Sequence, residues 1–236
     1  MSLQFKSKEL YKYLMFLDKK LTVSLKKSAE ITIISTNNGL DCLFFSETFA
    51  VSHTIPTIAI EDGQVTLDFD DLMSATSGAD EVELKEVDEN LAMVNNFPIF
   101  KLMYKSGTIN KVGENIVKLT KKDTNKFIKE LSSYRSQLKK SIFDESSWIY
   151  VLFSDGYIQF RTINPLEYKK SSVEIDGFQP RLEMFFDKSM IKIMDVFFKG
   201  NELKISDEVL ENSQYRVLFN HIQLNKMLYF PDKYMV

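Results

Sequence analysis

Apolar residues recur near the start of the chain with the spacing of one helix face. Leu10, Leu14, Leu17 and Leu21 follow one another at intervals of 4, 3 and 4 residues, and Ser7 stands where a helix cap is expected. These intervals put side chains on one side of a helix, so the pattern predicts an amphipathic helix from Ser7 to about Leu21. Alternating apolar and polar residues then predict strands at 31–34, 41–45 and 50–55, with a hairpin turn at 37–39.

The same order of elements returns in the second half of the chain. Adding 117 to the four leucine positions gives a second helix face, made of Phe127, Leu131, Tyr134 and Leu138. We therefore predict a helix from Thr120 to Leu138, with Thr120 and Asp123 at the spacing of a capping box. Strands are predicted at 148–153 and 157–162, on either side of an Asp-Gly hairpin turn at 155–156.

Further matches extend this internal repeat. The offset of 117 also relates Gly39 to Gly156 and Asp70 to Asp187, and an offset of 119 relates the Glu-Leu-Lys sequence at 83–85 to that at 202–204. Asp70 and Asp187 are each predicted to cap a second helix, and Gly200 to end the later one.

The ordered recurrence predicts two similar domains. We place them at 1–104 and 119–236, joined by a connector at 105–118 that has two glycines and few apolar residues. Each half has the order helix, strands, helix, strands. This order predicts an α+β fold in which each domain packs two helices on one face of antiparallel sheets.

Candidate catalytic chemistry is sparse. The single Cys42 excludes an internal disulfide and a thiolate zinc cluster, and neither His53 nor His221 has a histidine or cysteine at ligand spacing. The eight glycines form no phosphate-binding loop. The acidic group at 68–71 could hold magnesium, but strand termination and helix capping explain it better. We therefore expect no enzymatic activity, no metal and no cofactor.

The apolar runs are too short for a membrane span. None approaches the roughly 18–20 residues needed to cross a bilayer, and the charged start does not resemble a signal peptide. We expect a cytoplasmic protein with no membrane partner, in the host cytoplasm if a phage encodes it.

Lysines follow the helical spacing in an otherwise slightly acidic chain. The net charge is −3, so any charge that binds nucleic acid must be gathered on one surface. Three of the four predicted helices carry a lysine stripe, made of Lys8, Lys12 and Lys19, of Lys122, Lys126, Lys129 and Lys140, and of Lys188, Lys192 and Lys199. One such stripe is ordinarily a solvated face. The recurrence of the lysine stripe on three helices predicts contacts with the phosphates of duplex DNA, without recognition of the base sequence. The helix at Asp70 has no lysine.

The order of elements resembles the DNA sliding clamp family of polymerase processivity factors. The resemblance covers essentially the whole chain and is best over 31–104, with a proline-containing tail at Met227-Leu228-Tyr229-Phe230-Pro231. With two domains, the chain is similar to the trimeric clamps of T-even phages and to proliferating cell nuclear antigen. It is unlike the bacterial clamps, which are dimers of three-domain chains. The lysine-, isoleucine- and asparagine-rich composition suits an AT-rich phage genome.

The resemblance implies a homotrimeric ring around duplex DNA, with helices lining the hole and sheets outside. It implies a DNA polymerase and a clamp loader as partners, whose peptides would bind an apolar pocket formed by Leu40, Ile116, Phe230 and Pro231. Ordinary packing is the alternative for each of these four residues. The strand from Pro98 to Tyr104 is the candidate for one side of the subunit contact.

Two other functions stay open at this point. A monomeric processivity or DNA-binding factor of the same fold would hold DNA by affinity alone, with steep salt dependence and no preference for circular DNA. A structural phage protein would explain the duplication but not the lysines on equivalent helix faces.

Overall fold

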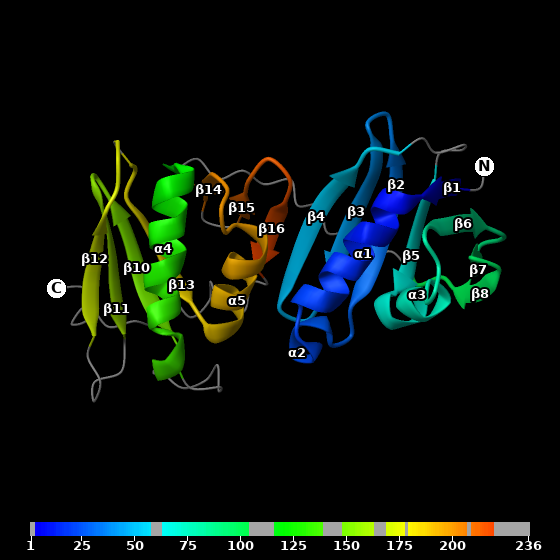
Figure 1. The fold of residues 1–236 in the computed structure, drawn as a ribbon, viewed down its shortest axis with the longest axis horizontal. Helices are drawn as coiled ribbons and strands as arrows, with labels where there is room; N and C mark the ends of the chain where they lie inside the picture. The colour runs from blue at the N-terminus through cyan, green and yellow to red at the C-terminus, as the bar shows by residue number, and fades with distance from the viewer. Residues whose placement is uncertain are drawn as a thin grey trace. The chain divides into compact units, whose positions relative to one another are not determined.

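The computed structural model describes residues 3–57, 63–103, 116–138, 148–162, 169–177, 179–206 and 209–219. The chain divides into two compact units, Met1–Ile109 with Gln214–Val217 and Asn110–Ser213 with Leu218–Val236 (Figure 1). The division between residues 109 and 110 falls within the predicted connector 105–118. Strand β9 (Val117–Leu119), in the second unit, begins within the last two residues of that range.

Unit 1 contains two antiparallel rows of four strands. One row has the order β1-β6-β7-β8 and the other β5-β2-β3-β4. The first is made of β1 (Gln4–Ser7), β6 (Val82–Glu86), β7 (Leu91–Val94) and β8 (Phe97–Phe100). The second is made of β2 (Glu30–Thr36), β3 (Gly39–Phe45), β4 (Phe49–Ile55) and β5 (Gln64–Asp68). Helix α1 (Lys8–Lys20) packs against β6, α3 (Phe69–Ala75) packs against β5 and β8, and the short α2 (Val23–Lys26) follows α1.

Unit 2 repeats this arrangement. Its rows have the orders β9-β14-β15-β16 and β13-β10-β11-β12. The further strands are β10 (Ile149–Ser154), β11 (Tyr157–Thr162), β12 (Lys170–Glu174), β13 (Leu182–Phe186), β14 (Leu203–Ile205), β15 (Val209–Glu211) and β16 (Arg216–Phe219). Helices α4 (Lys121–Ser133) and α5 (Lys188–Phe197) contact each other, and they pack on β9 and β12 and on β13, respectively.

The strand orders of the two units correspond position by position, as a duplicated fold requires. The offset between equivalent positions is not constant, however. It is 113 at the first helix caps, Ser7 and Thr120, and 119 at the second helix caps, Asp68 and Asp187. The predicted offset of 117 is therefore about one turn out of register in the first helix. It still selected the right face, because a shift of one turn returns to the same side of a helix.

Both predicted first helices are confirmed. The Ser7 hydroxyl accepts a hydrogen bond from the Leu10 N–H at 3.0 Å and caps α1, whose leucine stripe is buried. The Thr120 hydroxyl likewise accepts from the Asp123 N–H at 3.2 Å and caps α4. The apolar stripe beginning at Phe127 is buried, although the last turn of the predicted helix is a 3₁₀ turn at Arg135–Gln137.

The second helix of unit 1 begins two residues earlier than predicted. Asp68, not Asp70, is the cap, and its Oδ1 accepts from the N–H groups of Asp70 at 2.9 Å and Asp71 at 3.0 Å. The choice among these acidic residues depends on Phe69, which is fully buried with its ring edge-on to Phe44 at 5.2 Å. The predicted cap at Asp187 is confirmed, and the turn after α5 ends at Gly200, whose φ is +83°.

Replacing Asp68 by alanine is therefore expected to lower the free energy of unfolding by about 1 kcal/mol, because two N–H groups of α3 lose their acceptor. Asp70→Ala is the matched control, since the Asp70 side chain accepts no bond at this cap. Urea unfolding of both variants measures the difference. Equal destabilisation by the two substitutions would contradict the assignment of the cap.

A largely buried ion pair joins β6 to the segment after β8. Lys101 donates to Glu86, whose other carboxylate oxygen accepts from the Leu3 N–H at 3.0 Å. The two side chains are 13% and 16% exposed. Burial by itself raises the pKa of Glu86, but the Lys101 ammonium and the Leu3 N–H outweigh burial and hold that pKa below its usual range.

Glu86→Gln is expected to lower the free energy of unfolding at pH 7 by about 1–3 kcal/mol. The folded pKa of Glu86 lies below its unfolded value, so its stabilisation is present above about pH 4.5 and is lost as the pH falls through the folded value. The gap between wild type and variant should therefore narrow between pH 7 and pH 3 in urea titrations. Glu83→Gln is the control, because its pair with Lys6 is solvent-exposed and should matter little. A gap that does not change with pH would contradict this account.

Candidate nucleic-acid interface and partner pocket

The lysine stripe of α1 lies opposite the residues that pack on the sheets. Lys8, Lys12 and Lys19 are exposed, whereas the buried positions of the helix are Leu10, Tyr13, Leu14 and Leu17. At about 100° per residue the three lysines fall within some 40° of one another, and Leu17 lies on the far side of the helix. The sheets of unit 1 therefore fix this stripe toward solvent.

Helices α4 and α5 have the same geometry in unit 2. Lys122, Lys129 and Lys199 are exposed, and Lys126, Lys188 and Lys192 are half-buried. In both helices these positions lie opposite the buried residues. Lys140 lies outside the described residues.

Three of the candidate lysines pair with an acidic residue three or four positions earlier in the chain. Lys12 pairs with Glu9 at 2.5 Å, Lys126 with Asp123 at 3.1 Å and Lys199 with Asp195 at 3.2 Å. Within the part of the chain that the structure describes, six of the candidates have no ion pair, namely Lys8, Lys19, Lys122, Lys129, Lys188 and Lys192. The positive charge of these six is therefore not neutralised by a carboxylate in the described residues.

The Lys126 ammonium makes structural contacts within unit 2 and is not available to a ligand in the same way as the lysines without ion pairs. Its ammonium donates to Asp123 and to the Glu174 carbonyl at 3.0 Å. Asp123 is 1% exposed, and burial alone raises its pKa. The Thr120 hydroxyl, at 2.7 Å from Asp123 Oδ2, and Lys126 outweigh burial, so the pKa of Asp123 lies below its usual range. The predicted capping box is thus closed through the Thr120 side chain.

Lys121 is a basic residue that the spacing argument missed. It is exposed and opens α4 directly after its cap, just as Lys8 opens α1 and Lys188 opens α5. A cation at the first position of a helix is unfavourable by about 0.3–1 kcal/mol, because the N-terminal end of the helix dipole is positive. Lysine at this position in three helices is therefore not selected for helix stability. Helix α3 differs, with exposed Asp70 and Asp71 in its first turn.

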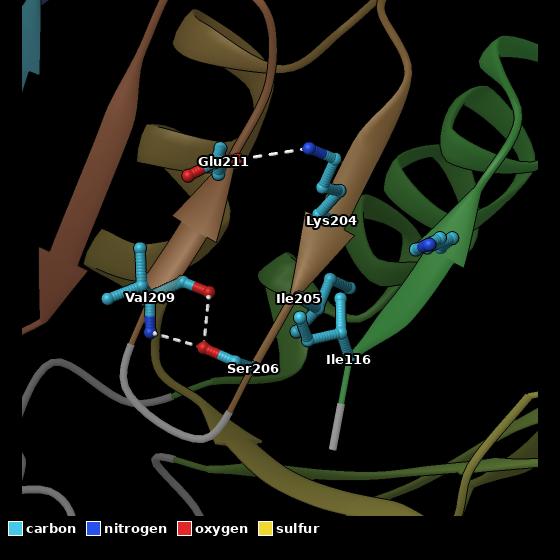
Figure 2. Close-up of a pocket in the computed structure, with 7 residues that line it drawn as sticks. Ile116, Lys204, Ile205, Ser206, Val209 and Glu211 are labelled. Atoms are coloured by element: carbon cyan, nitrogen blue, oxygen red, sulfur yellow. Dashed lines mark hydrogen bonds and ion pairs between the residues drawn. The ribbon is translucent and has the colours of Figure 1, made fainter. Parts of the chain in front are cut away.

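Of the four residues implied to form a partner pocket, Ile116 lines a hollow in the structure. This hollow of about 200 Å³ lies over β9, β14 and β15 of unit 2 (Figure 2). Its lining consists of Ile116, Lys118, Lys204, Ile205, Ser206, Val209 and Glu211. Leu40, which β3 places opposite Ser35 of β2 and Ile55 of β4, has no exposed surface in this structure. Phe230 and Pro231 lie outside the described residues.

Metal-binding geometry is absent from the described ranges, where no three His, Cys, Asp or Glu side chains gather. Among the helices described, none is long and apolar enough to cross a membrane.

No family model matches the sequence, and no curated protein matches it. Solved structures do match. A DNA polymerase III beta chain from Streptococcus pneumoniae superposes with a TM-score of 0.73 and 10% identity, over 93% of this chain and 65% of that chain. A sliding clamp (DNA polymerase III subunit beta) from Pseudomonas aeruginosa, bound to griselimycin, gives 0.71 and 10%, over 100% of this chain and 68% of that chain. This chain has the sliding-clamp fold.

A second Pseudomonas aeruginosa DNA polymerase III beta structure agrees, with a TM-score of 0.70 and 11% identity over 93% of this chain and 65% of that one. The sliding-clamp fold confirms the predicted α+β class with two similar tandem domains. The chain spans about two thirds of the length of the clamp chains that it matches.

If these helix faces bind duplex DNA, the double variant Lys122→Glu, Lys129→Glu should weaken that binding without changing the fold. Loss of two phosphate contacts should lower the slope of log affinity against log salt by about 2. Fluorescence anisotropy of a labelled duplex across a salt series measures this slope. Lys85→Glu with Lys118→Glu is a charge-matched control on exposed strand positions. An equal effect of both double variants would refute the helix-face assignment.

Proposed function

We propose that this protein is a DNA sliding clamp, a homotrimeric ring that encloses duplex DNA and tethers a DNA polymerase. The observation that carries the proposal is the combination of a duplicated sliding-clamp fold with lysine stripes turned away from the sheets. The protein would act without catalysing a reaction, because enclosure of the duplex keeps the polymerase at its template.

The lysine side chains suit sliding better than tight binding. Lysine is a mobile point charge on a flexible stem, so it contacts phosphates without fixing a register or reading bases. Such contacts weaken with salt and exchange readily along the duplex. Retention on DNA would then come from the closed ring and not from affinity.

Two exposed sheet edges support ring closure. Strand β8 ends its row in unit 1 and exposes Phe97 by 59% and Phe100 by 77%, and Met103 just after it is 90% exposed. Strand β12 ends a row in unit 2. A free apolar edge is an aggregation hazard for a monomer, and pairing β8 of one copy with β12 of the next would cover both edges.

The internal repeat supports the same pairing. Strand β4 of unit 1 is equivalent to β12, and it is contacted by Gln214–Val217, which group with unit 1. The carbonyl of Gln214 lies 2.8 Å from Nδ1 of His53 on β4. By the repeat, a short segment from a second copy would occupy the corresponding place on β12.

The size of the chain supports three copies. It has two domains of this fold and covers 65–68% of the matched clamp chains. Three such chains supply six domains, as many as two chains of the three-domain type. A clamp loader would be needed to open the ring. Ile116, Phe230 and Pro231 remain proposed residues of the partner pocket, whereas Leu40 is fully buried in this structure.

Light scattering over a concentration series tests ring formation. We expect a species of about 82 kDa, three times the 27.4 kDa chain. Phe97→Asp with Phe100→Asp should reduce this mass to that of the monomer while circular dichroism stays unchanged. Val23→Asp, which alters a single apolar residue exposed by 83%, is the control. A wild-type monomer at high concentration would overturn the ring and favour a DNA-binding factor that acts by affinity.

A further inference from the structure

Lys169, the residue just before β12, is fixed through both its backbone and its side chain. The Lys169 N–H donates to the Thr162 hydroxyl at 2.8 Å, and the Lys169 carbonyl accepts from the Thr162 N–H at 3.0 Å. The Lys169 ammonium lies 4.0 Å from the centroid of the Tyr134 ring and donates to the Ser133 hydroxyl at 2.8 Å. The positive charge of Lys169 is therefore held against the end of α4.

The Tyr134 ring is itself held in one orientation. Tyr134 is fully buried, and its ring stacks on that of Phe160 of β11 with the centroids 6.1 Å apart. Its hydroxyl lies 2.6 Å from the Ser171 hydroxyl, which donates to the Glu130 carboxylate at 2.6 Å. Because the Ser171 proton goes to Glu130, Tyr134 is the donor to Ser171. The ring under Lys169 is thus fixed by packing in the core and by a hydrogen bond to β12.

The Lys169 ammonium lies on the lysine stripe of α4. Ser133 is exposed and falls within about 40° of Lys122 and Lys129 around the helix axis, one turn beyond Lys129. Ser133 has no charge, so the stripe that α4 itself supplies ends at Lys129. Lys169, 36 residues further along the chain, supplies a cation at this place. It has no ion pair within the described ranges.

The next lysine along the chain has a different environment. Lys170 is the first residue of β12, is exposed and lies opposite Arg161 of β11. Side chains alternate along a strand, and Ser171 contacts α4 through Glu130, so Lys170 lies on the other face of the sheet. Lys169 is thus on the helix side of the sheet and Lys170 on the opposite side.

A lysine that is already ordered is well suited to bind an anion. An unrestrained lysine loses rotamer freedom when it binds, which opposes binding, whereas Lys169 has lost this freedom before a ligand arrives. Its ammonium has three N–H donors, and the bond to Ser133 uses one of them. The other donors can contact a phosphate without breaking the bond that holds the side chain.

We propose that Lys169 contacts a phosphate of duplex DNA and that Tyr134 is its positioning residue. The DNA-binding face of unit 2 then extends from α4 to the start of β12. The group bound is a phosphate and not a base, because the Tyr134 ring is buried and offers no surface for stacking. This proposal rests on the proposed function, since it requires duplex DNA along the lysine stripe of α4.

The salt dependence of DNA binding tests the contact. With the full chain and a labelled duplex, Lys169→Gln should lower the slope of log affinity against log salt by about 1, because one phosphate contact is lost. Lys170→Gln removes the same charge from the other face of the sheet and should leave the slope unchanged. If Lys122→Glu with Lys129→Glu lowers the slope and Lys169→Gln does not, the role of Lys169 is rejected and the DNA-binding face of α4 stands. If neither lowers it, both are rejected.

Two further variants separate DNA contact from a role in folding. Lys169→Arg keeps a cation that can lie over the Tyr134 ring, so it should keep the wild-type slope. Tyr134→Leu removes the ring but not the charge, so it should weaken binding several-fold at constant salt while the slope stays unchanged. Circular dichroism checks each fold, and Lys169→Arg decides alone if Tyr134→Leu does not fold. A slope lowered equally by Lys169→Arg and Lys169→Gln would overturn the phosphate contact. Wild-type affinity of folded Tyr134→Leu would overturn the positioning role.

Discussion

The burial of Phe127 in unit 2 fixes the orientation of the lysine surface there. Its ring lies among Phe153, Phe160 and Phe186, with centroids 5.4–5.8 Å apart, and these three come from β10, β11 and β13. Rolling α4 by one residue, about 100°, would remove Phe127 from this cluster and, in one of the two directions, would direct Lys126 into it. Burying an unpaired polar group and opening a cavity would each be expensive. The lysines of α4 therefore stay toward solvent because of a contact made on the opposite side of the helix.

Much of this fold could be predicted from sequence because its main signals are local. The helix caps at Ser7 and Thr120 could be predicted because they depend only on spacing within one helix. The same holds for the buried stripes of α1 and α4, so the error in the repeat offset did not affect these predictions. The cap at Asp68 was missed because three nearby aspartates satisfy the same local rule. Only the burial of Phe69 against a distant strand decides among them. The local sequence thus identifies a few possible cap residues, and the tertiary packing of Phe69 determines which of them caps α3.

The candidate surfaces were less predictable for the same physical reason. The contact of Lys126 with the carbonyl of Glu174 joins residues 48 apart, so no helical spacing could reveal that this lysine is engaged. Lys118 on β9 lies opposite Lys204 on β14, but the sequence alone does not reveal this pairing. It follows from the strand register and from the buried amide of Gln179, which is 61 residues from Lys118 along the chain. Leu40 was chosen by resemblance alone, whereas its side chain is fully buried in the structure. Ile116 does line a pocket, but its lysine neighbours could not be identified before the register was known.

Divergence between the repeats distributes charge unequally. In the described ranges, the helices of unit 2 carry five lysines without ion pairs and α1 of unit 1 carries three, while α3 adds two exposed aspartates. Helices α4 and α5 also contact each other, which gathers their charge into one patch. In the proposed ring, three such patches would alternate with three nearly neutral sectors. A duplex would then be attracted to separate zones and not to a uniform wall, so the second half of the chain would carry most of the salt-sensitive contact. Each half packs two equivalent helices on its sheets, so this inequality comes from the residues on the solvent faces and not from the packing beneath them.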